Sequence, residues 1–395
     1  MHCAVYQSID EIGPDRIAPL QGSPIDFSYG LLRALERSLW GDLKIRYLSI
    51  EEGGRVLAFI PVNIGTNIAF TAAMPTLVQT GYPALVDRLG LAAAYKIAVV
   101  GSLVSDRGFI PLHPDCDHDA VIELMIREID ALAREEKVQV CFLKDLHQDF
   151  PGRVRVRAAG FVECYSLPTV RIDTHFKSSD DYIQSLSTNG RSHARRTLRK
   201  VGKNFTLRVV TDFASLIPDV YPLFRATYMK AQFKLEELPP QFFVECGRAH
   251  PPSSEMVLCE KGSRIVGAYL VLYNAEQQLN KRIGIDYTDE ESPVIYNVLN
   301  YYCIIRAIER GIPLSYLGQT TYTPKVRMGG RLEDQFIYVK GYNLGVRLSL
   351  PLQRAWMNRY RTQQVHKQME ASADAPAKSL FRNPRGKWRQ ACSRG

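Results

Sequence analysis

The sequence predicts an α/β (α+β) protein built from two similar units in tandem, followed by a basic tail. A repeated strand–turn–strand pattern, a common order of elements after each repeat, and a polar, basic C-terminal composition support this prediction. The 395 residues suffice for about two domains, and 46% of them are hydrophobic, enough for packed cores. We place the first unit at 1–175, the second at 176–350 and a flexible tail at 351–395.

The repeat is a pair of β-hairpins. "IEEGGRVLA" (50–58) and "CEKGSRIVG" (259–267) align without gaps, and each lies between two apolar runs. The glycines permit a tight turn between two strands. Each hairpin is preceded by helical material, such as "SYGLLRALERSLW" in the first unit and "LIPDVYPLFRATYMKAQ" in the second.

A strand, a helix and another strand follow each hairpin. In the first unit these are "KIAVVGSLV", a helix at about 119–136, and "VQVCFLKDL"; in the second they are "NKRIGIDY", a helix at about 293–310, and "PLSYLG". Ser292 is the expected N-cap of the second helix, Pro293 suits its first turn, and Gly311 ends it. The two units therefore share one order of elements.

The net charge of +9 is concentrated in two places. Residues 354–395 contain ten Arg or Lys against two acids, and "NGRSHARRTLRKVGK" (189–203) contains six with no acid. The rest of the chain is slightly acidic. This distribution favours localised contacts with anions over a whole surface that binds a polyanion.

The stretch 189–203 is expected to form a helix. Arg191, Arg195, Arg199 and Lys203 then lie in one row at a spacing of four, with no carboxylate at the i+3 or i+4 positions. Arginine binds phosphates and carboxylates in bidentate geometry, so we expect an anion there. A solvated helix face is the alternative.

The loop "YLGQTTYTPKVRMGG" (316–330) follows the last strand of the second unit. It combines Gln319, Tyr322, Lys325 and Arg327 with paired glycines that permit close approach of the backbone. It lacks the spacing of a P-loop. We interpret it as part of a functional site; a structural connector is the alternative.

Two further segments contain residues that could bind a metal ion or transfer a proton. "HPDCDHD" (113–119) crowds potential metal ligands together, but contiguous residues seldom converge on one ion, so we expect an acidic loop before a helix and no metal site. Asp286, with Tyr287, ends a strand just before a helix and is the candidate general acid or base; a structural role is the alternative.

The sequence also bears on the cellular setting. The apolar runs at 67–78 and 91–104 are too short to span a bilayer, and the first residues do not read as a signal peptide. The eight cysteines are scattered without a CxxC pair, as expected of reduced thiols. We therefore expect a cytoplasmic protein with no membrane span.

The second unit resembles the GNAT N-acyltransferases of the FemAB/BioF2-like group. The resemblance rests on "GRSHARRTLRKV", "YPLFRATYMK", "VLCEKGSRIVGAYLVL" and the run from "IGIDYTDEESP" to "PKVRMGG", in that order. It covers about residues 25–345 and is more diffuse in the first half. It implies two tandem GNAT-like domains, each a mixed, mostly antiparallel sheet flanked by helices, with the degenerate first domain on the acceptor side.

The resemblance also implies a reaction. Family members transfer an acyl or aminoacyl group to an amine of a small molecule or peptide, forming an amide. Lys325 matches the family lysine that contacts the reacting carbonyl, and Arg191, Arg195 and Arg199 match an arginine-rich helix that holds ligand phosphates. Arg327 and Gln319 are further donor-binding candidates.

We assign two more roles by position. Asp286 is the expected acceptor of the amine proton, and Tyr322 the expected donor to the leaving group. No tightly bound cofactor is expected; the co-substrate is acyl-CoA, an acyl-carrier protein or an aminoacyl-tRNA.

One departure from the GNAT pattern affects the donor. The Q/R-x-x-G-x-G/A loop that holds CoA pyrophosphate is missing, and the corresponding "DYTDEESP" (286–293) is acidic. Acids at this helix N-terminus repel phosphate, which favours donors whose phosphates reach the arginine helix. The alternative function is a non-catalytic RNA-binding protein on the same scaffold, although few aromatic residues interrupt its basic segments.

Overall fold

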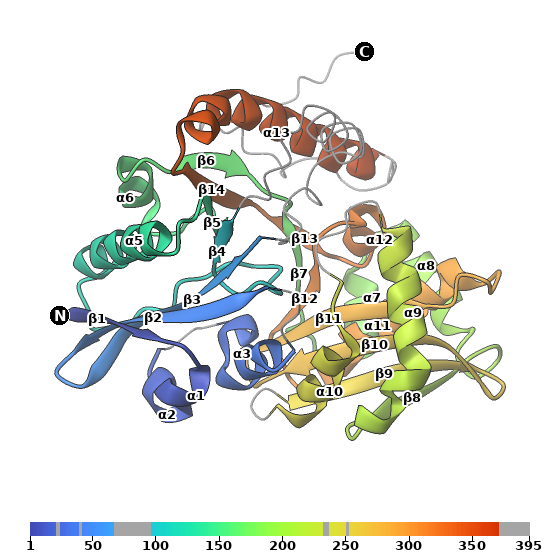
Figure 1. Ribbon diagram of the computed structural model, residues 1–395. Helices are drawn as coiled ribbons and strands as arrows, with labels where there is room; N and C mark the ends of the chain where they lie inside the picture. The colour runs from blue at the N-terminus through green and yellow to red at the C-terminus, as the bar shows by residue number, and fades with distance from the viewer. Residues whose placement is uncertain (21–23, 39–41, 67–95, 232–236, 250–252, 371–395) are drawn as a thin grey trace, which may run out of the picture.

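The computed structural model describes residues 1–395 except 21–23, 39–41, 67–95, 232–236, 250–252 and 371–395. Two mixed sheets lie side by side, each flanked by helices (Figure 1). Within the described residues each sheet has seven strands. The expected pair of mixed, mostly antiparallel sheets is confirmed.

The first sheet has the strand order β1-β2-β3-β4-β5-β14-β6. Its strands are β1 (His2–Tyr6), β2 (Lys44–Glu52), β3 (Arg55–Gly65), β4 (Ile97–Val100), β5 (Val140–His147), β14 (Gln335–Gly341) and β6 (Val162–Tyr165). Its neighbouring strands are antiparallel except β4 and β5, which are parallel.

The second sheet has the order β13-β7-β12-β11-β10-β9-β8. Its strands are β13 (Arg331–Glu333), β7 (Thr169–Asp173), β12 (Leu314–Gly318), β11 (Gln277–Ile285), β10 (Arg264–Tyr273), β9 (Ser253–Lys261) and β8 (Thr206–Val210). Here β11 and β12 form the parallel pair. The repeat in the sequence is therefore a repeat of strand order.

Both predicted hairpins form. Glu52 pairs with Arg55 across Gly53 and Gly54, and Lys261 pairs with Arg264 across Gly262 and Ser263. All three glycines have positive φ angles, between 57° and 79°. Only glycine adopts this conformation without a steric cost, so the turn residues fix both hairpins.

The two sheets exchange strands across the expected boundary at residue 175. Strand β7 precedes that boundary but pairs with β12 and β13 of the second sheet. Strand β14 lies in the expected second unit but pairs with β5 and β6 of the first sheet. The exchange ties the halves together through backbone hydrogen bonds.

Helices occupy both outer faces and the space between the sheets. They are α1 (Ile9–Ile12), α2 (Pro14–Ile17), α3 (Tyr29–Glu36), α5 (His118–Glu135), α6 (Arg153–Ala158), α7 (Ser179–Ser185), α8 (Thr188–Leu198), α9 (Ile217–Lys230), α10 (Pro240–Arg248), α11 (Ser292–Glu309), α12 (Tyr322–Arg327) and α13 (Leu344–Glu370), with short 3₁₀ turns η1 (Ile25–Phe27) and η3 (Ala214–Leu216). None of the helices described is long and apolar enough to cross a membrane.

One hydrophobic core joins the two halves. It contains Leu31 of α3 and Phe59 of β3 together with Phe224 of α9 and Leu270 of β10. A second core fills the space between α5 and the first sheet, and a third lies between α11 and the second sheet. Helices α9 and α11 therefore cover opposite faces of the second sheet.

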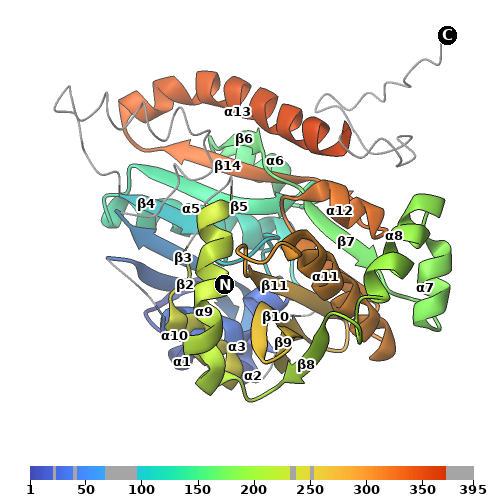
Figure 2. The ribbon, with the colours of Figure 1, turned by 90° about the vertical axis from the view of Figure 1, so that its right-hand side faces the viewer.

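The expectation of a loose tail from 351 onward is wrong for residues 351–370. Helix α13 continues through them and lies along β6, β14 and α12 (Figure 2). Met357, Arg361 and Val365 are buried, at a spacing of four residues that marks one helix face. The rest of the expected tail, 371–395, lies outside the described residues.

Candidate functional site

The parallel strands β11 and β12 separate in the middle of the second sheet. They pair over three positions, from Gln277 with Leu314 to Leu279 with Tyr316. Beyond these, the Asn280 side-chain amide donates to Ser315 Oγ and to the Tyr316 carbonyl, both at 2.9 Å. A cavity of about 420 Å³ lies at the separation, bordered by 280–283 of β11 and by 317–321, which end β12 and follow it.

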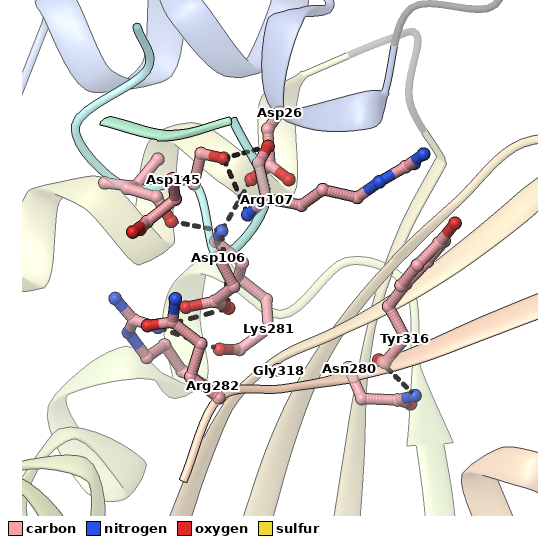
Figure 3. Close-up of polar contacts among 12 residues, drawn as sticks. Asp26, Asp106, Arg107, Asp145, Asn280, Lys281, Arg282, Tyr316 and Gly318 are labelled. Carbon is pink, nitrogen blue, oxygen red and sulfur yellow. Dashed lines mark hydrogen bonds and ion pairs between the residues drawn. The ribbon is translucent and has the colours of Figure 1, made fainter. Parts of the chain in front are cut away.

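A β-bulge on β11 directs two cationic side chains toward one point. On β10, Leu270 pairs with Arg282 and Val271 with Asn280, so Lys281 is the extra residue. A bulge turns consecutive side chains toward the same side. Lys281 Nζ lies 4.0 Å and an Arg282 guanidinium nitrogen 3.9 Å from Asp106 Oδ2 (Figure 3).

Asp106 belongs to the first half of the chain, in the segment after β4, and borders the cavity. Burial acts to raise the pKa of its carboxyl, but the charges of Lys281, Arg282, Lys144 and Lys325 hold that pKa below its usual value. Asp106 is therefore a carboxylate at neutral pH.

Lys281 of β11 contacts two other segments of the chain, η1 and the segment after β4. Its ammonium lies 2.6 Å from an oxygen of Asp26 in η1 and also donates to the Val104 carbonyl, two residues before Asp106. Both members of the ion pair are almost fully buried. Burial acts to lower the pKa of Lys281, but Asp26 and Asp106 raise it, so the ammonium stays charged. The pair holds the Asp106 segment against β11.

Lys325 borders the same cavity from α12. Its buried Nζ donates to the carbonyls of Gln319, at 2.8 Å, and Gly318, at 3.2 Å. Burial lowers the pKa of Lys325 to about 7, and the nearby charge of Asp106 only partly opposes this. Both the ammonium and the amine are therefore populated near neutral pH.

A strained turn brings those carbonyls to Lys325. Gly318, Thr320 and Thr321 have φ angles of 70°, 59° and 51°. Threonine is β-branched and rarely adopts positive φ, which costs about 1–3 kcal/mol per residue. Strain of this kind is concentrated at functional sites, which supports the interpretation of 316–330 as functional.

The other residues expected from that loop have different surroundings. Gln319 borders the cavity, and its side-chain nitrogen donates to the Leu167 carbonyl at 2.9 Å. Tyr322 is buried, its hydroxyl donates to the Pro168 carbonyl at 3.0 Å, and it is not among the residues that line the cavity. Tyr322 thus anchors α12 beside β7.

Asp286 does not line the cavity either. Its Oδ1 accepts hydrogen bonds from the backbone and hydroxyl of Thr288, at 2.9 and 2.6 Å. Its Oδ2 lies 3.6 Å from an Arg264 nitrogen. These contacts fix the turn between β11 and α11, where the sequence placed Asp286.

The arginines of the basic stretch lie apart from the cavity. Arg191 donates to the carbonyls of Gln184 and Leu186, at the end of α7. Arg195 on α8 and Arg199, which caps the C-terminal end of that helix, are exposed. Arg327 of α12 is partly buried, and its charge lowers the pKa of His193 after the larger effect of burial. None of these four arginines is among the residues lining the cavity.

The acidic segment before α11 has basic partners from other elements. Glu291 pairs with Lys200 at 2.9 Å, and Asp289 pairs with Arg264 at 2.9 Å and Lys261 at 3.2 Å. Lys200 of the basic stretch thus has a carboxylate partner from a segment distant in sequence. These pairs neutralise part of the charge expected to repel phosphate.

The "HPDCDHD" segment leads into a helix, as expected. Asp117 is the N-cap of α5, and its carboxylate accepts from the backbone nitrogens of Asp119 and Ala120, both at 3.1 Å. Asp119 pairs with Arg155 at 2.8 Å. The acids of this segment stabilise the start of α5.

Three of the cavity's charged residues lie outside every motif in the sequence. Asp106, Lys281 and Arg282 have no characteristic spacing around them, and Asp106 is about 175 residues from the other two. Lys281 and Arg282 lie inside β11 and Asp106 lies six residues after β4, so no strand end in the sequence marks them.

Solved structures show which fold this arrangement belongs to. No protein-family model and no curated protein matches the chain. The structure of FemX is similar at 11% identity with a TM-score of 0.61, over 89% of this chain and 99% of that one. The C-terminal domain of a putative lysylphosphatidylglycerol synthetase from Agrobacterium fabrum is similar at 14% identity, TM-score 0.52, over 88% and 96%.

A third structure, L-PGS from Bacillus licheniformis, is similar at 11% identity with a TM-score of 0.51, over 88% of this chain and 96% of that one. At these identities the similarity concerns the fold. The two seven-stranded mixed sheets and this similarity together give the chain the FemX-like tandem GNAT fold.

Proposed function

We propose that this protein is an N-acyltransferase that forms an amide from an activated acyl group and an amine. One observation carries the proposal: Lys325 and Asp106, from opposite halves of the chain, border one cavity where β11 and β12 separate. A cation can stabilise the oxyanion and a carboxylate can accept the proton that the amine loses, and both contributions speed acyl transfer to an amine.

The reaction assigns each group a role. The amine nitrogen attacks the carbonyl carbon of a thioester or ester, and the Lys325 ammonium donates a hydrogen bond to the oxyanion that forms. Asp106 accepts the proton that the nitrogen loses. The C–S or C–O bond then breaks, the amide is released, and the proton passes to the departing thiolate or alkoxide.

Three kinds of acyl donor are compatible with the proposed reaction. Exposed arginines on α8 offer contacts to donor phosphates, which are present in acyl-CoA, in acyl-carrier protein and in aminoacyl-tRNA. The FemX-like fold favours the aminoacyl-tRNA alternative, and the cavity favours none of the three. The amine belongs to a small molecule or a peptide.

The test is amide formation by the full-length protein with labelled acyl-CoA, acyl-carrier protein and aminoacyl-tRNA pools, each with a mixture of amines. We expect one pool to yield an amide. Lys325→Ala should lower kcat by roughly 10²–10³-fold and Asp106→Asn by roughly 10²–10⁴-fold. Lys177→Ala, an exposed lysine, should not change kcat.

The dependence of kcat on pH distinguishes a Lys325 ammonium that stabilises the oxyanion from a neutral Lys325 amine that acts as a base. If the ammonium stabilises the oxyanion, the step that depends on it weakens as pH rises through the Lys325 pKa of about 7. Full activity in Lys325→Ala, or no amide from any donor, contradicts the proposal.

A non-catalytic RNA-binding role is the second candidate, favoured by the exposed Arg195, Arg196 and Arg199. It predicts RNA affinity that falls steeply with salt, by about one unit of log slope per neutralised phosphate. Weak affinity that is indifferent to salt contradicts this role.

A further inference from the structure

The wall of the cavity contributed by α9 and α10 is aromatic. Four rings line it: Tyr221, Phe224 and Tyr228 from α9, and Phe243 from α10. The Phe224 and Phe243 rings stack with centroids 4.5 Å apart, and Tyr221 meets Phe243 edge-on at 6.0 Å. We call these four residues the aromatic wall.

Several polar atoms near the aromatic wall are bonded to the protein, and the exposed Lys230, at the end of α9, lies with its Nζ 4.0 Å from the centre of the Tyr287 ring. The Tyr221 hydroxyl donates to the Leu238 carbonyl at 3.1 Å, and the Thr227 hydroxyl accepts from the Ile285 backbone nitrogen at 3.1 Å. The charged side chains of Arg225 and Glu237 pair with each other at 3.2 Å and are largely exposed. The aromatic wall therefore presents mainly carbon to the cavity.

The aromatic wall lies on the same face of the second sheet as Asp106. Leu270 packs with Phe224 in the core between the sheets, and Leu270 pairs directly with Arg282, so Arg282 points to that face. Arg282 is the residue that approaches Asp106. The proton acceptor and the aromatic wall are thus on one side of β11.

The arginines of α8 lie on the opposite side. Helix α11 covers the other face of the sheet, and α8 packs against α11 (Figure 2). A donor held by α8 would reach the separation of β11 and β12 from the α11 side. The second substrate then enters from the side of the aromatic wall.

We propose that the acceptor is an amine with a large apolar body, of the arylalkylamine class. Its body packs on the aromatic wall while its nitrogen lies beside Asp106. Aromatic rings gain from stacked and edge-on contacts beyond the area they bury, so an aryl group suits this wall best. The inference deepens the proposed N-acyltransferase function and rests on it.

Binding without a donor is the first test. Calorimetric titration of the full-length protein should show 2-phenylethylamine binding roughly tenfold or more tightly than ethanolamine, because both carry one ammonium and only the first buries a ring. Equal or tighter binding of ethanolamine overturns the inference.

Three variants test whether 2-phenylethylamine binds at the aromatic wall. Tyr228→Ala should weaken 2-phenylethylamine binding by about tenfold, and Tyr228→Phe, which keeps the ring, should restore it. Met229→Ala, an exposed neighbour on the same helix, should leave binding unchanged. If Tyr228→Ala binds 2-phenylethylamine as the unaltered protein does, the inference is overturned.

A transfer assay separates this inference from the proposed function. With one active donor, 2-phenylethylamine should have a higher kcat/KM than ethanolamine, and Tyr228→Ala should remove the difference. Efficient transfer to ethanolamine alone, or a preference for aromatic groups only on the acyl side, overturns the inference and leaves the function standing. Tight 2-phenylethylamine binding without transfer from any donor counts against the function.

Discussion

At the scale of the residue, the cavity depends on a lysine in an unfavourable environment. Lys325 is buried, and burial disfavours its charged form, which lowers its pKa to about 7. Asp106 has the opposite surroundings, with four basic groups that hold its pKa low. The surroundings of Lys325 thus favour its neutral amine, whereas those of Asp106 favour its ionised carboxylate.

The burial of Lys325 has a consequence for stability. A lysine whose pKa is about 7 when folded and near 10.5 when unfolded destabilises the fold fully below pH 7, and the penalty disappears as pH rises from 7 to 10.5. Lys325→Met should therefore raise Tm most at pH 6 and least near pH 10. Calorimetric scans over this range measure it; a gain in Tm that grows with pH contradicts the assignment.

At the scale of the element, one ion pair connects segments that are distant in sequence. Lys281 of β11 binds Asp26 of η1 and the Val104 carbonyl, and so orders the segment that carries Asp106. A buried pair adds little net stability compared with apolar residues, but loss of one partner leaves the other charge buried alone. Its main effect is on the position of Asp106.

Urea unfolding can measure the difference between removing one member of this ion pair and removing both. Lys281→Met should lower the free energy of unfolding by about 3–5 kcal/mol, because Asp26 is left buried without its partner. The double variant Lys281→Met with Asp26→Leu should recover most of that loss. A double variant whose loss equals the sum of the two single losses shows that the groups are not coupled.

At the scale of the whole molecule, exchanged strands and a terminal helix join the halves. Strands β7 and β14 each pair in the sheet of the other half. Helix α13 then packs against β6, β14 and α12, which carries Lys325. Arg361 of α13 is buried and donates to the Tyr165 carbonyl at 2.6 Å. The position of Lys325 therefore depends on the C-terminal part of the chain.

The contribution of α13 is testable with two arginines on the same helix. Arg361→Ala should lower the free energy of unfolding by roughly 2–4 kcal/mol, because it removes a buried side chain and leaves the Tyr165 carbonyl unpaired. Arg359→Ala, at an exposed position, should change it by less than about 0.5 kcal/mol. Equal effects of the two variants exclude a specific contribution of Arg361.

Local signals account for what could be predicted of the fold. Glycines at the hairpin turns, Pro293 and Gly311 around α11, and alternating apolar runs act over a few residues, so sequence reasoning found both hairpins and the helices α5, α9 and α11. The sequence predicted a loose tail because residues from 354 onward are strongly basic and lack a clear apolar period, whereas the structure buries Met357 and Val365 on one face of α13.

Local patterns in the sequence predicted the strands, the helices and their repeated order, and they singled out the loop that contains Lys325 and Gln319, both of which line the cavity. Tertiary structure alone decided which strands were exchanged and which charges met. Asp106 and Lys281 come together because a bulge in β11 and the contacts of Lys281 with Asp26 and the Val104 carbonyl hold the segment after β4 against β11, and such long-range packing leaves no local pattern.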